Sequence, residues 1–172
     1  MTRFLRPSFP ETVDEVSARL VGFGVVVQSA LYLWLRSPIS LVVLAFGFAA
    51  RVYAGPRFSP LGLLVTRVVR PRLISVAPKM VPGPPKRFAQ SIGLVFSGAA
   101  VIASATGADT VAVVLICGLT AAASLEAFAG ICLGCTAFRW LMRVGVIPSS
   151  VCAACNDISA HLAQRSALLN RS

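Results

Sequence analysis

The chain has 172 residues, of which 56% are hydrophobic and only 13% are charged. A soluble domain of this length is rarely so apolar. The formal net charge of +10 would suggest nucleic acid as a partner in a soluble protein. Here the basic residues lie between long apolar segments, so the composition excludes a nucleic-acid-binding role and favours an integral membrane protein surrounded by lipid.

The N-terminal segment, residues 1–18, is polar. It lacks the short apolar stretch and small-residue cleavage site of a secretory signal. We therefore expect this segment to remain on the protein and to lie in the cytoplasm.

Residues 19–35 and 38–54 form the first two predicted transmembrane helices. The second is short for a span, but Arg51 near its end could extend its side chain to the lipid interface. Pro38 suits the first turn of a helix, so Arg36-Ser37-Pro38 is interpreted as a tight turn between antiparallel helices. The alternative is one kinked helix over residues 20–50, which would give three spans in total.

Residues 55–87 are predicted to form a basic cytoplasmic loop. Ser59-Pro60 is typical of a helix start, and apolar residues then recur at helical spacing. We expect an interfacial amphipathic helix here, beside anionic phospholipid. The alternative is a site for an anionic substrate. The predicted lipid-interface residues are Arg57, Arg67, Arg70 and Arg72.

Residues 88–108 and 110–135 are predicted as the third and fourth spans, with Gly107 in the turn between them. Glu126 is the one charge between residues 110 and 138. The expected fold is therefore an all-α integral membrane bundle of four transmembrane helices within residues 19–138. The interfacial amphipathic helix lies between helices 2 and 3, and small residues along the spans would also permit a homo-oligomer.

The basic residues predict the orientation of this bundle. In the four-span arrangement, every Lys and Arg except Arg36 falls on one side of the membrane. The positive-inside rule then places both termini in the cytoplasm of a multi-pass plasma-membrane protein. Residues 139–172 form the predicted cytoplasmic tail.

Two C-x-x-C pairs form the most distinctive motif. Cys132 and Cys135 lie at the end of the predicted fourth span, whereas Cys152 and Cys155 lie in the tail. This spacing is typical of a four-thiolate zinc site. The same residues could instead carry out thiol–disulfide exchange or sulfur relay, since one thiolate attacks and its neighbour resolves the intermediate. Another metal centre, such as an iron–sulfur site, and plain apolar packing are the remaining interpretations.

Three other residues carry weaker signals. Glu126 within a span is costly, so it is a candidate intramembrane proton site. The alternative is a carboxyl that is held neutral or is hydrogen-bonded across the bundle to polar groups such as Gln90, Ser91 or Gln28. Cys117 lies mid-span and is interpreted as a packing residue. His161 in the tail could replace a metal ligand, although four thiols already complete a site.

The chain resembles a bacterial membrane family catalogued as domain of unknown function 4395. Arg57 to Gly62, Pro84 to Gly93, Glu126 and Cys132-Leu133-Gly134-Cys135 carry the resemblance, which covers about residues 21–138. The second cysteine pair lies beyond it. The resemblance assigns no activity and no catalytic residue, but it implies association with thioredoxin-like or sulfurtransferase partners.

The expected function is that of a membrane protein whose cytoplasm-facing cysteine pairs bind a metal, zinc foremost, or exchange disulfides with a soluble partner. The main alternative is a transporter for a sulfur-containing or anionic solute that uses Glu126. A third interpretation is a structural subunit of a membrane complex. The motifs do not decide whether the protein is an enzyme.

Overall fold

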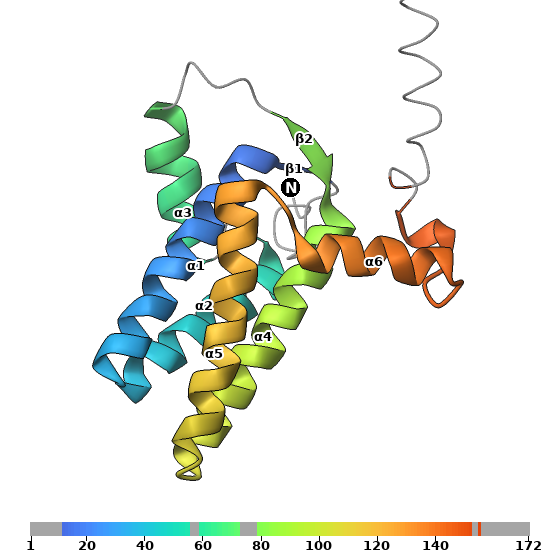
Figure 1. Ribbon diagram of the computed structural model, residues 1–172. Coiled ribbons are helices and arrows are strands. Elements are labelled where there is room, and N and C mark those ends of the chain that lie inside the picture. Colours follow the sequence, from blue (N-terminus) through green and yellow to red (C-terminus); the bar gives the residue numbers. More distant parts are fainter. Residues whose placement is uncertain (1–11, 56–58, 73–78, 153–154, 156–172) are drawn as a thin grey trace, which may run out of the picture.

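The computed structural model describes residues 12–55, 59–72, 79–152 and 155. Four long helices pack against one another: α1 (Glu15–Leu35), α2 (Pro38–Ala54), α4 (Gly83–Ala105) and α5 (Asp109–Ser124), the last extended by the π-helical turn η3 (Leu125–Ala129) (Figure 1). Three of the described helices, α1, α4 and α5 with η3, are long and apolar enough to cross a membrane. α2 is apolar but shorter.

α1 begins at Glu15, four residues before the predicted start of the first span. Asp14 causes this earlier start, because its carboxylate accepts hydrogen bonds from the backbone N–H groups of Val16 at 3.4 Å and Ser17 at 3.3 Å. The residues before Glu15 also form a strand that the all-α prediction lacks. β1 (Thr12–Asp14) pairs antiparallel with β2 (Met80–Pro82), with Val13 opposite Val81.

α1 and α2 are separate, antiparallel helices, as the turn at Arg36-Ser37-Pro38 predicts. Arg36 adopts the left-handed conformation with φ of 52°, and Pro38 occupies the first turn of α2. This geometry excludes the single kinked helix over residues 20–50. The turn lies at the opposite end of the molecule from β1 and β2 (Figure 1).

The basic connection contains α3 (Pro60–Leu64), the π-helical turn η1 (Val65–Val69) and the 3-10 turn η2 (Arg70–Arg72). Leu61 packs closely against α1 at Gly24, and Val65 is buried. Part of the apolar side of this short helical segment therefore contacts the helices, while Leu64 and Val68 are exposed. Its placement at a lipid interface remains a prediction.

α4 begins at Gly83, five residues before the predicted third span. Pro84 and Pro85 occupy its first turn, where a missing N–H costs nothing. The helix therefore starts within the segment predicted as a basic loop, residues 55–87. Consequently Lys86 belongs to α4 rather than to the basic loop.

The fourth predicted span, residues 110–135, is shorter in the structure. Gly130 adopts a positive φ of 70° and ends the helix after Ala129. The chain then turns into α6 (Leu133–Arg143), which leaves the direction of α5 and runs away from the bundle (Figure 1). A final 3-10 turn, η4, spans Ser149–Cys152.

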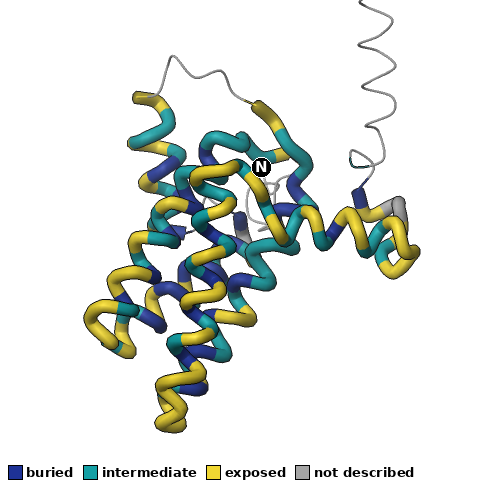
Figure 2. Tube along the Cα trace, viewed as in Figure 1, coloured by how far each residue is buried: buried dark blue, intermediate teal, exposed yellow. Residues whose placement is uncertain are grey.

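The core lies where the four long helices meet. Leu41 and Leu44 of α2 and Ile116 of α5 are among its fully buried side chains. Figure 2 shows exposed positions along the outward sides of the helices and along α6. Large apolar side chains occupy many of these exposed positions: Phe23, Val27, Trp34, Ile39, Phe46, Val95, Ile102, Val111 and Val114.

Candidate functional site

The first cysteine pair lies at the break between η3 and α6. Cys132 is the N-cap residue of α6, and its sulfur accepts a hydrogen bond from the backbone N–H of Cys135 at 3.3 Å. Both thiols are free and partly buried. Their position differs from the sequence expectation, because the pair opens a new helix instead of closing the preceding one.

The surroundings of the two thiols shift their pKa values in opposite directions. A hydrogen bond from the Cys135 thiol is the main cause that lowers the pKa of Cys132, with smaller help from the nearby Lys86 cation. The same hydrogen bond, together with burial, raises the pKa of Cys135. Cys132 is therefore the thiol that ionises more readily, and Cys135 is the one that stays protonated more readily.

A charged pair lies beside these thiols. The Nζ atom of Lys86 in α4 lies 2.5 Å from Oε1 of Glu126 in η3, and both side chains are largely shielded from solvent. The cost of burying Glu126 is thus offset by an opposite charge. Its predicted hydrogen-bonded state is found, with lysine rather than a polar residue as partner. A role of Glu126 in proton transfer remains a prediction.

Arg51 forms a second buried group behind this pair. Its guanidinium donates to Oε1 of Gln90 at 2.8 Å and to Oγ of Ser59 at 3.1 Å, and it lies 4.5 Å from the ring centre of Phe48. The expected extension of Arg51 to the lipid interface is therefore wrong. A guanidinium bonded to Gln90 and Ser59 of neighbouring segments, and resting on Phe48 of its own helix, is held inside the protein.

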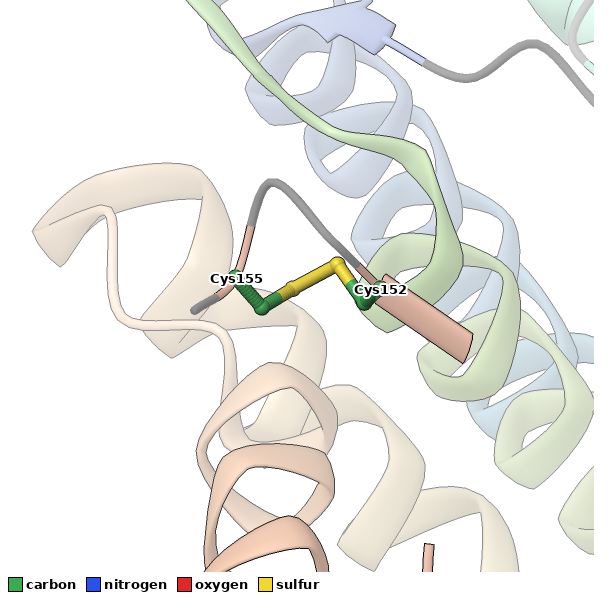
Figure 3. The surroundings of a disulfide bond; sticks show 2 residues. All are labelled: Cys152 and Cys155. Atoms are coloured by element: carbon green, nitrogen blue, oxygen red, sulfur yellow. A yellow bond between two sulfur atoms is a disulfide. The ribbon is translucent and has the colours of Figure 1, made fainter. Parts of the chain in front are cut away.

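The second cysteine pair is oxidised. Cys152 and Cys155 are joined by a disulfide bond (Figure 3), and Cys152 is buried. Within the described residues, no group of three or more His, Cys, Asp or Glu side chains is placed to hold a metal ion. The structure thus shows one dithiol and one disulfide, and zinc binding remains a prediction from the cysteine spacing.

The remaining predicted site residues are more dispersed. Arg67 and Arg72 are exposed, while Arg70 forms an ion pair with Asp14 at 2.6 Å. Cys117 is exposed on α5. Arg57 and His161 lie outside the described residues.

Sequence reasoning did not identify Lys86 or Arg51 as part of this site. Lys86 and Glu126 are 40 positions apart, and Lys86 was counted among the loop cations. The isolated carboxyl of Glu126 was the available signal, since a buried charge requires a partner of opposite sign.

Together these elements define a helical protein with three helices suited to a membrane and a reduced C-x-x-C pair at one end of its bundle. Residues 13–143 match the model of a family described as domain of unknown function, DUF4395. The match covers most of the chain, so the protein belongs to this family. No curated protein and no solved structure matches the chain.

Proposed function

We propose that this protein is a multi-pass membrane protein that performs thiol–disulfide exchange at Cys132 and Cys135. The observation that carries the proposal is the reduced, partly buried pair at the start of α6, where the sulfur of the N-cap residue Cys132 accepts a hydrogen bond from the backbone N–H of Cys135. A thiolate at a helix N-terminus attacks a disulfide, and a protonated neighbour then resolves the mixed disulfide.

The placement in a membrane rests on the outer surface of the helices. Trp34 is 82% exposed, Ile39 is 73% exposed and Val95 is 67% exposed. Apolar side chains this exposed along several neighbouring helices are stabilised by lipid and would cause aggregation in water. In the proposed arrangement, α1, α2, α4 and α5 all cross the bilayer, and α3 and α6 lie near one interface.

The proposed orientation places the cysteines at the cytoplasmic face. Arg19 donates to the backbone carbonyl of Phe128 at 2.8 Å, and Arg87 donates to that of Val52 at 3.1 Å. These bonds place basic side chains at the same end of the bundle as Cys132, whereas Arg36 lies at the other end. The positive-inside rule assigns the more basic end to the cytoplasm. The partner in exchange would be a soluble thiol protein of the thioredoxin-like or sulfurtransferase type.

A trapping experiment tests this function. Purified Cys135→Ser protein, reduced and mixed with a labelled peptide disulfide, should retain the peptide as a mixed disulfide on Cys132. Cys132→Ser should trap none, and Cys117→Ser, which changes a distant thiol, should behave as the unaltered protein. Equal exchange by Cys132→Ser would contradict the proposal. So would one equivalent of bound zinc with all four paired thiols protected, which is the prediction of the cysteine spacing.

A further inference from the structure

A cavity of about 410 Å³ lies between α1, α4, α5 and α6, next to the reduced cysteine pair. Its walls are mainly apolar and include Val25, Phe96 and Leu119. Cys132, Glu126 and Gln90 are the charged or hydrogen-bonding side chains among its lining residues. The volume and the few convergent polar groups are typical of a site for a small organic ligand.

The polar groups of this cavity are held in fixed positions. Arg51 donates to the side-chain oxygen of Gln90, which leaves the amide NH2 of Gln90 to donate to a ligand. Lys86 holds the carboxylate of Glu126 from the other side. A ligand here would meet a hydrogen-bond donor and a reactive sulfur within otherwise apolar walls.

We propose that this cavity binds the ring of a lipid-soluble quinone, which accepts the two electrons of the Cys132–Cys135 dithiol. The inference rests on the proposed thiol exchange and adds its electron acceptor. A dithiol that becomes a disulfide releases two electrons and two protons, which is what a quinone takes up to become a hydroquinone. The ligand must also be apolar, because the walls come from helices that face lipid in the proposed arrangement.

The reaction balances in two steps. The Cys132 thiolate attacks the quinone ring and forms a carbon–sulfur bond, while an electron pair moves onto a carbonyl oxygen that takes up a proton. Cys135 then loses its proton and attacks the sulfur of Cys132. The sulfur–sulfur bond forms, the carbon–sulfur bond breaks, and the released electron pair with the second proton completes the hydroquinone. The net change is two thiols and one quinone to one disulfide and one hydroquinone.

The positions of the two cysteines fit these roles. Cys132 lines the cavity, whereas Cys135 is absent from its lining residues and lies in the first turn of α6. Cys132 is therefore the residue placed to attack the ligand, and Cys135 is close enough in the motif to resolve the adduct. A disulfide on a soluble partner would react with the same two cysteines from the side away from the cavity.

The test compares two substitutions of the same type on α5. Ala122 lines the cavity, and its neighbour Ala121 is exposed on the outer side of the helix. Ala122→Leu should fill ligand space and slow quinone reduction by about tenfold or more, while Ala121→Leu should have no effect. The probe is decylubiquinone, added without oxygen to reduced protein in detergent. Hydroquinone is followed by absorbance, and free thiols are counted by alkylation and mass spectrometry.

Each variant is also assayed for exchange with the labelled peptide disulfide, which separates the two proposals. The inference is supported if the unaltered protein oxidises Cys132 and Cys135 with one quinone per pair, and if Ala122→Leu loses this reaction but keeps disulfide exchange. Intact exchange without quinone reduction, or equal quinone reduction by both leucine variants, overturns the quinone site and leaves the proposed function standing. Absence of both reactions in the unaltered protein overturns both proposals.

Discussion

The two thiols at the start of α6 are chemically unequal although they belong to one short motif. Cys132 accepts hydrogen bonds from the backbone N–H and from the thiol of Cys135, so its negative charge is stabilised. Cys135 provides that stabilisation and is therefore harder to ionise. In the proposed exchange, this arrangement makes Cys132 the attacking thiol and Cys135 the resolving one.

Alkylation at different pH values should reveal this inequality. With iodoacetamide, Cys132 should be modified at a lower pH than Cys135, because its pKa lies below the ordinary thiol value and that of Cys135 lies above it. Mass spectrometry of the two sites gives each profile. In Cys132→Ser, Cys135 loses its main perturbing partner, so its profile should shift to lower pH. An unchanged Cys135 profile in that variant would show that another group controls it.

The Lys86–Glu126 pair should influence both stability and thiol reactivity. Lys86→Met leaves the Glu126 carboxylate unpaired in apolar surroundings, which should cost roughly 3–5 kcal/mol. The double variant with Glu126→Gln should recover part of that loss, as measured by thermal unfolding in detergent. The pKa of Cys132 should rise in Lys86→Met and fall in Glu126→Gln, since lysine favours the thiolate and glutamate opposes it. If both substitutions shifted the pKa of Cys132 in the same direction, the charges of Lys86 and Glu126 would not control that pKa.

At the scale of elements, close helix contact fixes the position of the cysteines. Gly134 lies against α4, where an added Cβ would come within 2.6 Å of the Cα of Ala89. Because the obstacle is backbone, a side chain there would force α6 away from α4. The glycine within the C-x-x-C motif therefore positions Cys132 at the cavity.

Gly134→Ala should consequently destabilise the protein by about 1–3 kcal/mol and change the alkylation rate of Cys132. Gly98→Ala in α4 is the matched control, because no atom lies within 4 Å of its added Cβ. The helix propensity of alanine should make the control neutral or slightly stabilising. Equal unfolding temperatures for the two variants would contradict the close contact.

Asp14 ends β1, caps α1 and forms an ion pair with Arg70 of η2. The stability of this junction should therefore depend on pH. Burial opposes ionisation of Asp14, but hydrogen bonds from Arg70 and Ser17 outweigh it and hold the pKa of Asp14 below its usual range. A carboxyl with a lowered pKa stabilises the fold above the unfolded value of about 3.9 and loses this contribution as pH falls through the folded value.

Asp14→Asn retains a helix cap but removes the charge, so it should lower stability by about 1 kcal/mol at pH 7. The difference from the unaltered protein should shrink as the pH falls below the unfolded value of about 3.9 and through the folded pKa of Asp14, because the carboxyl is then becoming protonated. Thermal unfolding at pH 7 and at an acidic pH measures this change. Asp109→Asn, at an exposed position bonded to Ser104, should show no such difference at either pH.

The helices were predictable to different degrees, and the reasons are physical. The α1–α2 turn at Pro38 and the turn at Gly107 follow from residues with restricted or special backbone preferences. The end of the helix at Gly130 was not predicted, because the flanking residues are as apolar as the span itself. A single glycine there does not distinguish a kink, a helix end or a close contact.

The site was predictable at its cysteines and at Glu126, since thiol pairs and buried charges are conspicuous in any sequence. The contacts of Lys86, Gln90 and Arg51 were not, because they depend on the packing of α2, α4 and η3. Charge counting placed Lys86 and Arg51 with the loop and lipid-facing cations. In the structure, both turn inward to partners.

For the whole molecule, the proposed orientation can be tested in intact cells. In a background with all cysteines replaced by serine, Thr106→Cys lies at the α4–α5 turn, and Val146→Cys lies after α6. A membrane-impermeant maleimide should label the first from outside and the second only after cell lysis. The reverse pattern would place the dithiol outside the cell and refute a cytoplasmic exchange partner.

The inward orientation of the Arg51 side chain has a consequence for the lipid around the proposed bundle. α2 has 17 residues, or about 26 Å at 1.5 Å per residue, which is less than a hydrocarbon thickness of roughly 30 Å. A guanidinium committed to Gln90 and Ser59 cannot extend this helix to the headgroups. In the proposed arrangement, in which α2 crosses the bilayer, the acyl chains beside Ile39 and Phe46 shorten or tilt, and this hydrophobic mismatch would draw the protein toward thin regions of its membrane.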